Sequence, residues 1–258
     1  MKENMILKKM KDGQQVVGTF FETIGTSIVE CLGIAGLDFF IVDFEHSTFT
    51  AESLLEIVHT AELRDMSTLM RIKEISRSNV LRPLDVGVQG LIIPNVQSVE
   101  EVKQVIKWGK YTPIGERGFF YSRVTDFGFS DNVNDLDQFF ESRNRESLII
   151  PQCETVECLN VIEEICALEG VDGIFVGPYD LTIALGIPAQ FDHPTYTEAL
   201  ARIYKACRGN NKFTLIFGAD TEQARRYREY GFDAITCSMD ASLMIQAFKA
   251  MLETVKAD

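Results

Sequence analysis

The sequence contains neither paired cysteines nor a long apolar run. Its six cysteines stand singly, with no C-x-x-C pair and no histidine partner at zinc-finger spacing. No stretch approaches the roughly 20 apolar residues of a membrane span, and the N-terminal segment lacks the apolar core of a signal peptide. We therefore expect a soluble, cytoplasmic protein with no membrane partner, whose cysteines are buried, reduced thiols.

Signatures of phosphate binding are also absent. Neither G-x-G-x-x-G nor G-x-x-x-x-G-K-[ST] occurs, so the usual signs of a dinucleotide or nucleoside-triphosphate site are missing. Lys and Arg number 25 against 38 Asp and Glu, which gives a net charge of −13. A nucleic-acid backbone needs clustered basic residues, so we expect no nucleic-acid partner. With 46% hydrophobic and 24% charged residues, the chain is not disordered and can bury a large core.

A repeated connection from helix to strand organises the chain. Four times a helical stretch is followed by glycine, an apolar residue, a polar or acidic residue and a strand-like run, starting at Gly36, Gly87, Gly170 and Gly231. Glycine closes a helix readily, and the apolar run that follows suits a strand buried on both faces. Further apolar runs bring the strand candidates to eight: Val16–Phe21, Thr68–Arg71, Leu148–Pro151 and Phe213–Phe217.

Helices are predicted between these strands. Their starts are indicated by Thr50 with Glu52, by a capping box of Ser98 and Glu101, and by Thr221 with Glu222. Eight alternating units in 258 residues favour a single (β/α)₈ TIM barrel over an open sheet, and we expect one domain spanning residues 1–258. The segment from Tyr111 to Arg145 is predicted to be a long excursion at one rim. His59 and His193 are interpreted as structural.

Polar residues at the ends of the apolar runs are the candidates for chemistry, because parallel barrels carry their active residues at the carboxyl ends of strands. The second run ends in Asp43 and Glu45, which the two-residue period of a strand places on one side, and His46 follows at the rim. The other candidates end later runs: Arg71, Gln152 with Glu154, Gly177 to Asp180, and Gly218 to Asp220.

Glu154 and Asp180 are predicted metal ligands. They end neighbouring strands, and Gln152 shares the side of Glu154. Two carboxylates near other oxygen donors suit a hard divalent cation such as Mg²⁺ or Mn²⁺. Simpler interpretations stay open. Glu154 and Asp180 also fit acids at helix starts, Arg71 fits an ion pair with one of them, and His46 fits a hydrogen-bonded rim residue.

Eight segments, taken together, resemble the HpcH/HpaI family of metal-dependent, class II pyruvate aldolases. They occur in order at family spacing and cover nearly the whole chain. These segments are Gly18-TF, Asp43-FEH, Leu69-MR, Leu91-IIPNVQSVEE, Tyr111-TPIGERG, Pro151-QCET, Gly177-PYDLTIALG and Tyr230-GFDAI.

The resemblance implies a barrel of the phosphoenolpyruvate/pyruvate type and assigns roles within it. Glu154 and Asp180 would hold Mg²⁺, Mn²⁺ or Co²⁺, and Gln152 would orient a bound 2-ketoacid. Arg71 would meet the ketone oxygen. The family also implies a homo-oligomer, a hexamer built from dimers.

Acid–base and anion-binding roles complete the expected site. The resemblance implies that His46 belongs to the acid–base machinery, and we expect Asp43 to support it by fixing its tautomer. Backbone N–H groups of Tyr179 and Asp180, at the start of a helix, are candidates to bind the substrate carboxylate.

The expected reaction is cleavage of a 4-hydroxy-2-ketoacid to pyruvate and an aldehyde through a metal-stabilised pyruvate enolate. Two alternatives stay open: a citrate-forming condensation of oxaloacetate with an acetyl thioester on the same site, and a ligand-binding barrel without activity. The chain departs from the family at Phe119–Arg123, which we expect to shape the aldehyde pocket, and at Tyr179, which replaces a small residue.

Overall fold

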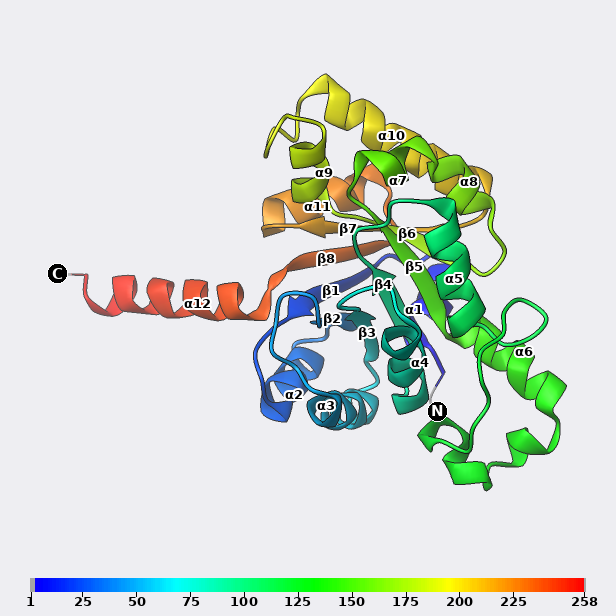
Figure 1. The fold of residues 1–258 in the computed structure, drawn as a ribbon. Helices are drawn as coiled ribbons and strands as arrows, with labels where there is room; N and C mark the ends of the chain where they lie inside the picture. The colour runs from blue at the N-terminus through cyan, green and yellow to red at the C-terminus, as the bar shows by residue number, and fades with distance from the viewer. Residues whose placement is uncertain (1–2, 258) are drawn as a thin grey trace.

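Eight parallel strands close into a barrel in their sequence order (Figure 1). The computed structural model describes residues 3–257. Each strand pairs with its sequence neighbours, and the last strand pairs with the first. The predicted single (β/α)₈ TIM barrel is confirmed. The strands are β1 (Val16–Phe21), β2 (Phe39–Asp43), β3 (Ser67–Arg71), β4 (Gly90–Ile93), β5 (Leu148–Cys153), β6 (Gly173–Val176), β7 (Phe213–Gly218) and β8 (Ala234–Met239).

Helices follow the strands and surround the barrel. The α-helices are α1 (Met5–Lys11), α2 (Thr26–Ile34), α3 (Ala51–Leu63), α4 (Arg77–Val86), α5 (Val99–Gly109), α6 (Leu136–Glu146), α7 (Val156–Asn160), α8 (Ile162–Ala167), α9 (Pro178–Ala184), α10 (Pro194–Gly209), α11 (Thr221–Tyr230) and α12 (Asp240–Val255). Two short 3₁₀ helices, η1 (Arg123–Gly128) and η2 (Asp131–Asn134), lie between α5 and α6.

Most of the helix starts and ends that the sequence predicted are confirmed. Ser98 and Glu101 form the predicted capping box of α5. Gly87 and Gly231 close α4 and α11 in the left-handed conformation, with φ of 113° and 107°. At the start of α11, the side chain that caps the helix is Asp220, whose Oδ1 accepts a hydrogen bond from the backbone N–H of Gln223 (2.8 Å).

The barrel interior is filled by alternate residues of the strands. In β2, Phe39 and Ile41 point inward while Phe40 and Val42 pack against the surrounding helices. The same inward face continues through Asp43, so this residue ends its strand inside the barrel mouth. The opposite end is closed by α1, whose buried apolar residues join the inner cluster, a role that the sequence analysis did not predict.

The excursion after α5 does not reach the cavity described below. Phe119 packs against Tyr121, Phe139 and Phe140, and the last part of the segment forms α6. A segment that joins the end of a helix to the start of the next strand lies at the amino-terminal end of the barrel, opposite the strand ends that carry chemistry. Within one subunit, the structure therefore does not place Phe119–Arg123 at the cavity, contrary to the prediction that this segment shapes the aldehyde pocket.

Helix α12 extends away from the barrel (Figure 1, red). A set of its apolar side chains is exposed: Leu243, Met244, Ile245, Phe248, Met251, Leu252 and Val255. Within residues 3–257, no helix combines the length and apolar character needed to cross a bilayer. All six cysteines are free thiols. Four of them are buried, but Cys31 is exposed and Cys237 is half-buried, so the prediction of burial is wrong for these two.

Candidate active site

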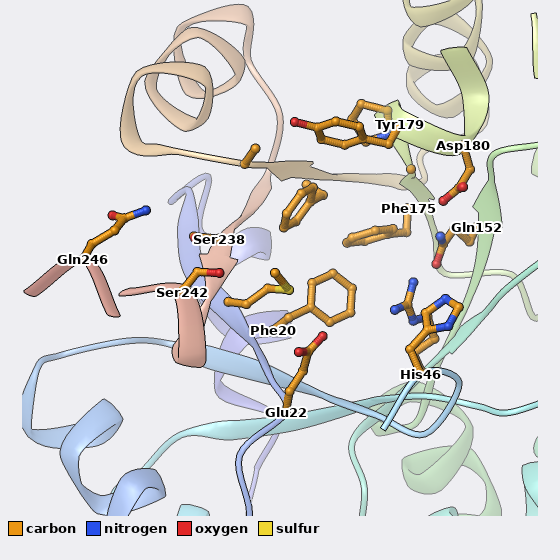
Figure 2. A pocket seen from close by; sticks show the side chains of 16 residues that line it. Phe20, Glu22, His46, Gln152, Phe175, Tyr179, Asp180, Ser238, Ser242 and Gln246 are labelled. Carbon is orange, nitrogen blue, oxygen red and sulfur yellow. The ribbon is translucent and has the colours of Figure 1, made fainter. Parts of the chain in front are cut away.

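A cavity of about 410 Å³ lies at the carboxyl ends of the strands (Figure 2). The predicted site residues that line it are His46, Arg71, Gln152, Tyr179 and Asp180. The other two predicted residues lie behind this surface, each hydrogen-bonded to a lining side chain: Asp43 to Arg71, and Glu154 to Gln152. The structure thus brings together the seven residues to which the sequence analysis gave a role in the site.

Asp43 and Arg71 form a two-pronged ion pair across β2 and β3. The Nε and Nη2 atoms of Arg71 donate to the two carboxylate oxygens of Asp43 at 2.9 and 2.7 Å. The two residues are direct partners in the β2–β3 register, so their side chains project to the same face. Burial alone would lower the pKa of Arg71, but the hydrogen bonds and charge of Asp43, together with the charges of Glu45 and Glu154, outweigh this effect, and the pKa is raised. The guanidinium therefore stays cationic.

This pair corrects the expected role of Asp43. Its carboxylate accepts from Arg71 and from the backbone N–H of Glu45, and the structure gives no bond between Asp43 and His46 in residues 3–257. His46 lies beyond the strand end with an exposed side chain, whereas Asp43 is fully buried inside the barrel mouth. The carboxylate near His46 is instead Glu45, whose Oε2 lies 3.6 Å from Nε2 of His46 and 3.3 Å from Nε of Arg71.

Glu154 is a buried carboxylate at the end of β5. Its Oε1 accepts a hydrogen bond from the backbone N–H of Asn95 (2.7 Å), and its Oε2 accepts one from Nε2 of Gln152. The pKa of Glu154 is raised to about 7, chiefly by burial and also by the nearby charges of Asp180 and Glu45, while the two hydrogen bonds act in the opposite direction. Thr155, rather than Glu154, caps helix α7, so the simpler interpretation of Glu154 as a helix cap is wrong.

The oxygen atoms around Glu154 fit a divalent cation. The Oε1 atom of Gln152 is buried without a hydrogen-bond partner in the described part of the chain. Asp180, which lines the same end of the cavity, adds a carboxylate from the first turn of α9. A buried carboxylate with a second carboxylate near it favours a bound cation over mutual repulsion. Within residues 3–257 no cluster of three or more His, Cys, Asp or Glu side chains is arranged to hold a metal.

Gly177 allows the start of α9 to approach this cluster. A Cβ atom at this position would lie 2.9 Å from Oε2 of Glu154 and 3.0 Å from Nε2 of Gln152. Helix α9 begins at Pro178 with no side-chain cap, so its first backbone N–H groups have no side-chain acceptor. Tyr179 turns its ring against Phe191, with ring centroids 5.0 Å apart, and forms one wall of the cavity.

The comparison with known proteins gives the family. The model of the HpcH/HpaI aldolase/citrate lyase family matches residues 17–247. This chain belongs to the HpcH/HpaI aldolase/citrate lyase family. A crystal structure of an HpcH/HpaI aldolase from Desulfitobacterium hafniense DCB-2 is 34% identical, with a TM-score of 0.90 over 97% of this chain and 96% of the other.

Named relatives in the HpcH/HpaI family are aldolases. The chain is 25% identical to 2-keto-3-deoxy-L-rhamnonate aldolase of Salmonella gallinarum, over 98% of this chain and 94% of that protein. It is 26% identical to 4-hydroxy-2-oxo-heptane-1,7-dioate aldolase of Escherichia coli, over 96% and 94%. A citrate synthase, SbnG, is 24% identical with a TM-score of 0.87 over 98% of both chains, which shows a shared fold alone. The protein is an enzyme, a carbon–carbon lyase of the aldolase type that acts on a small molecule.

Several polar residues of the cavity were not predicted. Glu22, Ser238, Ser242 and Gln246 line it, and they come from the end of β1, from β8 and from the start of α12. Glu22 lies two residues after the inward-facing Phe20, so the period that selected Asp43 also points to Glu22. The sequence analysis did not apply this rule to the first and last strands. Ser242 and Gln246 carried no such signal, because α12 continues directly from β8 and only the structure shows which of its residues face the cavity.

Proposed function

We propose that this enzyme is a divalent-metal-dependent aldolase that cleaves a 4-hydroxy-2-ketoacid to pyruvate and an aldehyde. The observation that carries the proposal is the convergence of a half-buried, cationic Arg71 with the Glu154, Gln152 and Asp180 cluster at one end of a single cavity. An anionic intermediate with oxygen atoms that can face a guanidinium and a metal matches this arrangement.

The reaction needs one proton to leave, one bond to break and one proton to return. A base removes the proton of the C4 hydroxyl, the C3–C4 bond breaks, and its electron pair moves into the enolate of pyruvate. The aldehyde then leaves, and protonation at C3 gives pyruvate. The enzyme accelerates cleavage by stabilising the negative charge that develops on the enolate oxygen.

We assign Arg71 to the ketone oxygen. Asp43 occupies Nε and Nη2, and Nη1 has no hydrogen-bond partner in the described part of the chain, so this nitrogen is available to a ligand in the cavity. Asp43 is a positioning residue, because it fixes the plane and direction of the guanidinium without lining the cavity. The first backbone N–H groups of α9, at Tyr179 and Asp180, are assigned to the carboxylate of the ketoacid.

Glu154 and Asp180 are assigned as the metal ligands, with Gln152 orienting the ketoacid beside them. A bound Mg²⁺, Mn²⁺ or Co²⁺ ion would supply Lewis-acid stabilisation of the enolate. The support in this chain is the raised pKa of the buried Glu154 and the unpartnered Oε1 of Gln152. Both indicate a place where negative charge and lone pairs outnumber the protein groups that can satisfy them.

His46 is assigned as the base for the C4 hydroxyl. It lines the cavity, and Glu45 stands beside it rather than Asp43. Glu45 also approaches Nε of Arg71, so it links the base and the cation as a positioning residue. Its pKa is raised by burial, against the lowering effects of Arg71 and His46.

Pyruvate release tests the function. The purified enzyme is incubated with 4-hydroxy-2-ketoacids, and pyruvate is measured through lactate dehydrogenase after treatment with EDTA and after addition of Mg²⁺, Mn²⁺ or Co²⁺. We expect activity to disappear with EDTA and to return with a metal. Cleavage that survives EDTA would overturn the metal assignment. Thiol release from acetyl-CoA with oxaloacetate, without pyruvate release, would favour the citrate-forming alternative, and no turnover of any kind would favour an inactive barrel.

We further propose that the enzyme is a homo-oligomer, a hexamer built from dimers, in the cytoplasm. The exposed apolar face of α12 supports the first point, because monomeric proteins rarely expose a contiguous patch of this kind. The six free thiols support a reducing compartment.

A further inference from the structure

We propose that the aldehyde half of the substrate is uncharged and bears hydroxyl groups, and that Glu22, Ser238, Ser242 and Gln246 recognise it. This inference rests on the proposed aldolase function and concerns the end of the cavity away from the predicted metal ligands. It selects one class among 4-hydroxy-2-ketoacids, namely those whose carbon chain beyond C4 carries hydroxyl groups rather than a second carboxylate.

The cavity has two ends of different chemistry. Figure 2 shows His46, Gln152 and Asp180 together on one side and Ser238, Ser242 and Gln246 on the other. Glu22 and Phe20 lie between these two groups. A ketoacid whose first two carbons are held beside Asp180 therefore directs the rest of its chain past Phe20 toward β8 and the start of α12. We call this second side, with Ser238, Ser242 and Gln246 and with Glu22 at its border, the distal end.

The charges of the distal end oppose a carboxylate. Glu22 is its one charged lining residue, and Asp240 lies behind Glu22, where its carboxylate accepts hydrogen bonds from the backbone N–H groups of Glu22 (3.0 Å) and Thr23 (3.1 Å). The cation that lines the cavity is Arg71, and its charge is already paired with Asp43. A second substrate carboxylate at the distal end would thus meet negative charge without a free cation to offset it.

The hydrogen-bonding groups of the distal end match hydroxyl groups instead. Ser238 and Ser242 can each donate and accept, Gln246 can do both through its amide, and Glu22 accepts. Apolar surface from Phe20, Phe217 and Met239 separates these groups and suits the carbon atoms that carry the hydroxyls. Ser238 is the buried member of this set, and its polar atoms are left unpaired when a substrate lacks the matching hydroxyl, so the site favours a hydroxylated substrate.

Two relatives illustrate the two classes. The name of the Salmonella enzyme specifies a sugar-acid substrate, 2-keto-3-deoxy-L-rhamnonate, which has one carboxylate and a hydroxylated tail. The name of the Escherichia coli enzyme specifies a 1,7-dioate, whose tail ends in a second carboxylate. Identity to the two is nearly equal, at 25% and 26%, so overall similarity does not choose between them. The residues of the distal end do, and they favour the hydroxylated class.

The test compares two substrates of equal chain length, 4,5-dihydroxy-2-oxohexanoate and 4-hydroxy-2-oxohexane-1,6-dioate. We expect kcat/KM for the dihydroxy substrate to exceed that for the dioate by about tenfold or more. In Glu22→Gln this ratio should fall severalfold because the dioate improves, and Glu22→Lys should lower it further. Ser242→Ala should weaken cleavage of the dihydroxy substrate more than that of the dioate. Glu198→Gln, on the exposed surface of α10, is the matched control and should keep the ratio of the unaltered enzyme.

A separate readout distinguishes failure of this inference from failure of the aldolase proposal. The exchange of the C3 protons of pyruvate for deuterium needs no aldehyde. It is monitored by NMR, with diamagnetic Mg²⁺ in place of Mn²⁺. If the unaltered enzyme exchanges pyruvate protons but prefers the dioate, or if the Glu22 and Ser242 variants leave the ratio unchanged, the inference is wrong. If it neither exchanges pyruvate protons nor cleaves either substrate, the aldolase proposal itself fails.

Discussion

Asp43 and Arg71 hold each other through two parallel hydrogen bonds at the mouth of the barrel, and only Arg71 reaches the cavity. The carboxylate is completely buried, and the guanidinium also packs over the ring of Phe20 at 4.7 Å. This geometry makes the orientation of the cation a property of the strand register rather than of a flexible side chain. It also joins catalysis to stability, because neither member of the pair can be removed without leaving the other unpaired.

Replacing Arg71 with Ala should therefore damage both folding and turnover. The uncompensated Asp43 carboxylate should lower the free energy of unfolding by about 3–5 kcal/mol. The double variant Asp43→Ala/Arg71→Ala should lose less than the sum of the two single changes, as measured by urea denaturation. Strict additivity would show that the pair is not energetically coupled.

Arg71→Lys separates the two roles. It keeps a positive charge near Asp43 but loses the planar fork, so we expect most of the stability to remain while kcat/KM falls by about 100-fold. Steady-state kinetics and thermal unfolding of the same preparation check this outcome. Full activity in this variant would show that the direction of the guanidinium does not matter.

Glu154 should make the stability of the metal-free enzyme depend on pH. Its pKa is about 7 in the folded protein against an ordinary value of 4.5, so the folded chain holds the proton more tightly than the unfolded chain does. The stabilisation is complete below pH 4.5 and is lost as the pH rises through about 7. A difference of this size corresponds to about 3 kcal/mol.

Urea denaturation between pH 5 and pH 8 in EDTA measures this effect. The unaltered enzyme should lose stability across that range, and Glu154→Gln should remove this part of the pH dependence, whatever its effect on stability at a single pH. Saturating Mg²⁺ should reverse the trend, because metal binding requires the ionised carboxylate. Identical pH profiles for the two proteins in EDTA would mean that Glu154 is not the buried titrating group.

The substitutions His46→Ala and His193→Ala form a matched pair. His46→Ala should lower kcat by about 10²–10⁴-fold, the usual contribution of a positioned base, with little loss of stability because the side chain is exposed. His193 accepts a hydrogen bond from the backbone N–H of Thr195 at the start of α10, so His193→Ala should cost about 1 kcal/mol of stability and leave kcat intact. Near-normal kcat in His46→Ala would remove it from the mechanism.

The apolar face of α12 should hold the oligomer together. Phe248→Glu places a charge in the middle of that face and should shift the enzyme toward smaller species in light scattering coupled to size-exclusion chromatography. Lys249→Glu alters the charge at the next position and should leave the mass unchanged. A monomeric unaltered enzyme would contradict the proposed assembly before either variant is made.

The hydrophobic period of the strands and the residues that begin and end the helices predicted the barrel, because each of these signals is local. Glycine after α4 and α11, the capping box of α5 and the eight apolar runs all depend on neighbouring residues. The candidate site followed from one further rule, that chemistry lies at the carboxyl ends of parallel strands.

What the sequence did not predict depends on contacts between elements. The carboxyl group of Asp43 could face His46 or Arg71, and the β2–β3 register places it beside Arg71. The backbone of Asn95 donates to Glu154 from a different loop, which no spacing rule indicates. The Phe119 segment precedes a strand, so the sequence already contained the connectivity that determines its position. The sequence analysis considered only its aromatic residues.

A crystal structure with Mn²⁺ and pyruvate tests the central claim most directly, because anomalous scattering locates the ion independently of the model. We predict a manganese peak bound by the carboxylates of Glu154 and Asp180, with the ketone oxygen of pyruvate facing Arg71 and its methyl group directed toward Phe20 and the distal end. A metal peak elsewhere, or pyruvate bound without contact to Arg71 and this pair of carboxylates, would contradict the account.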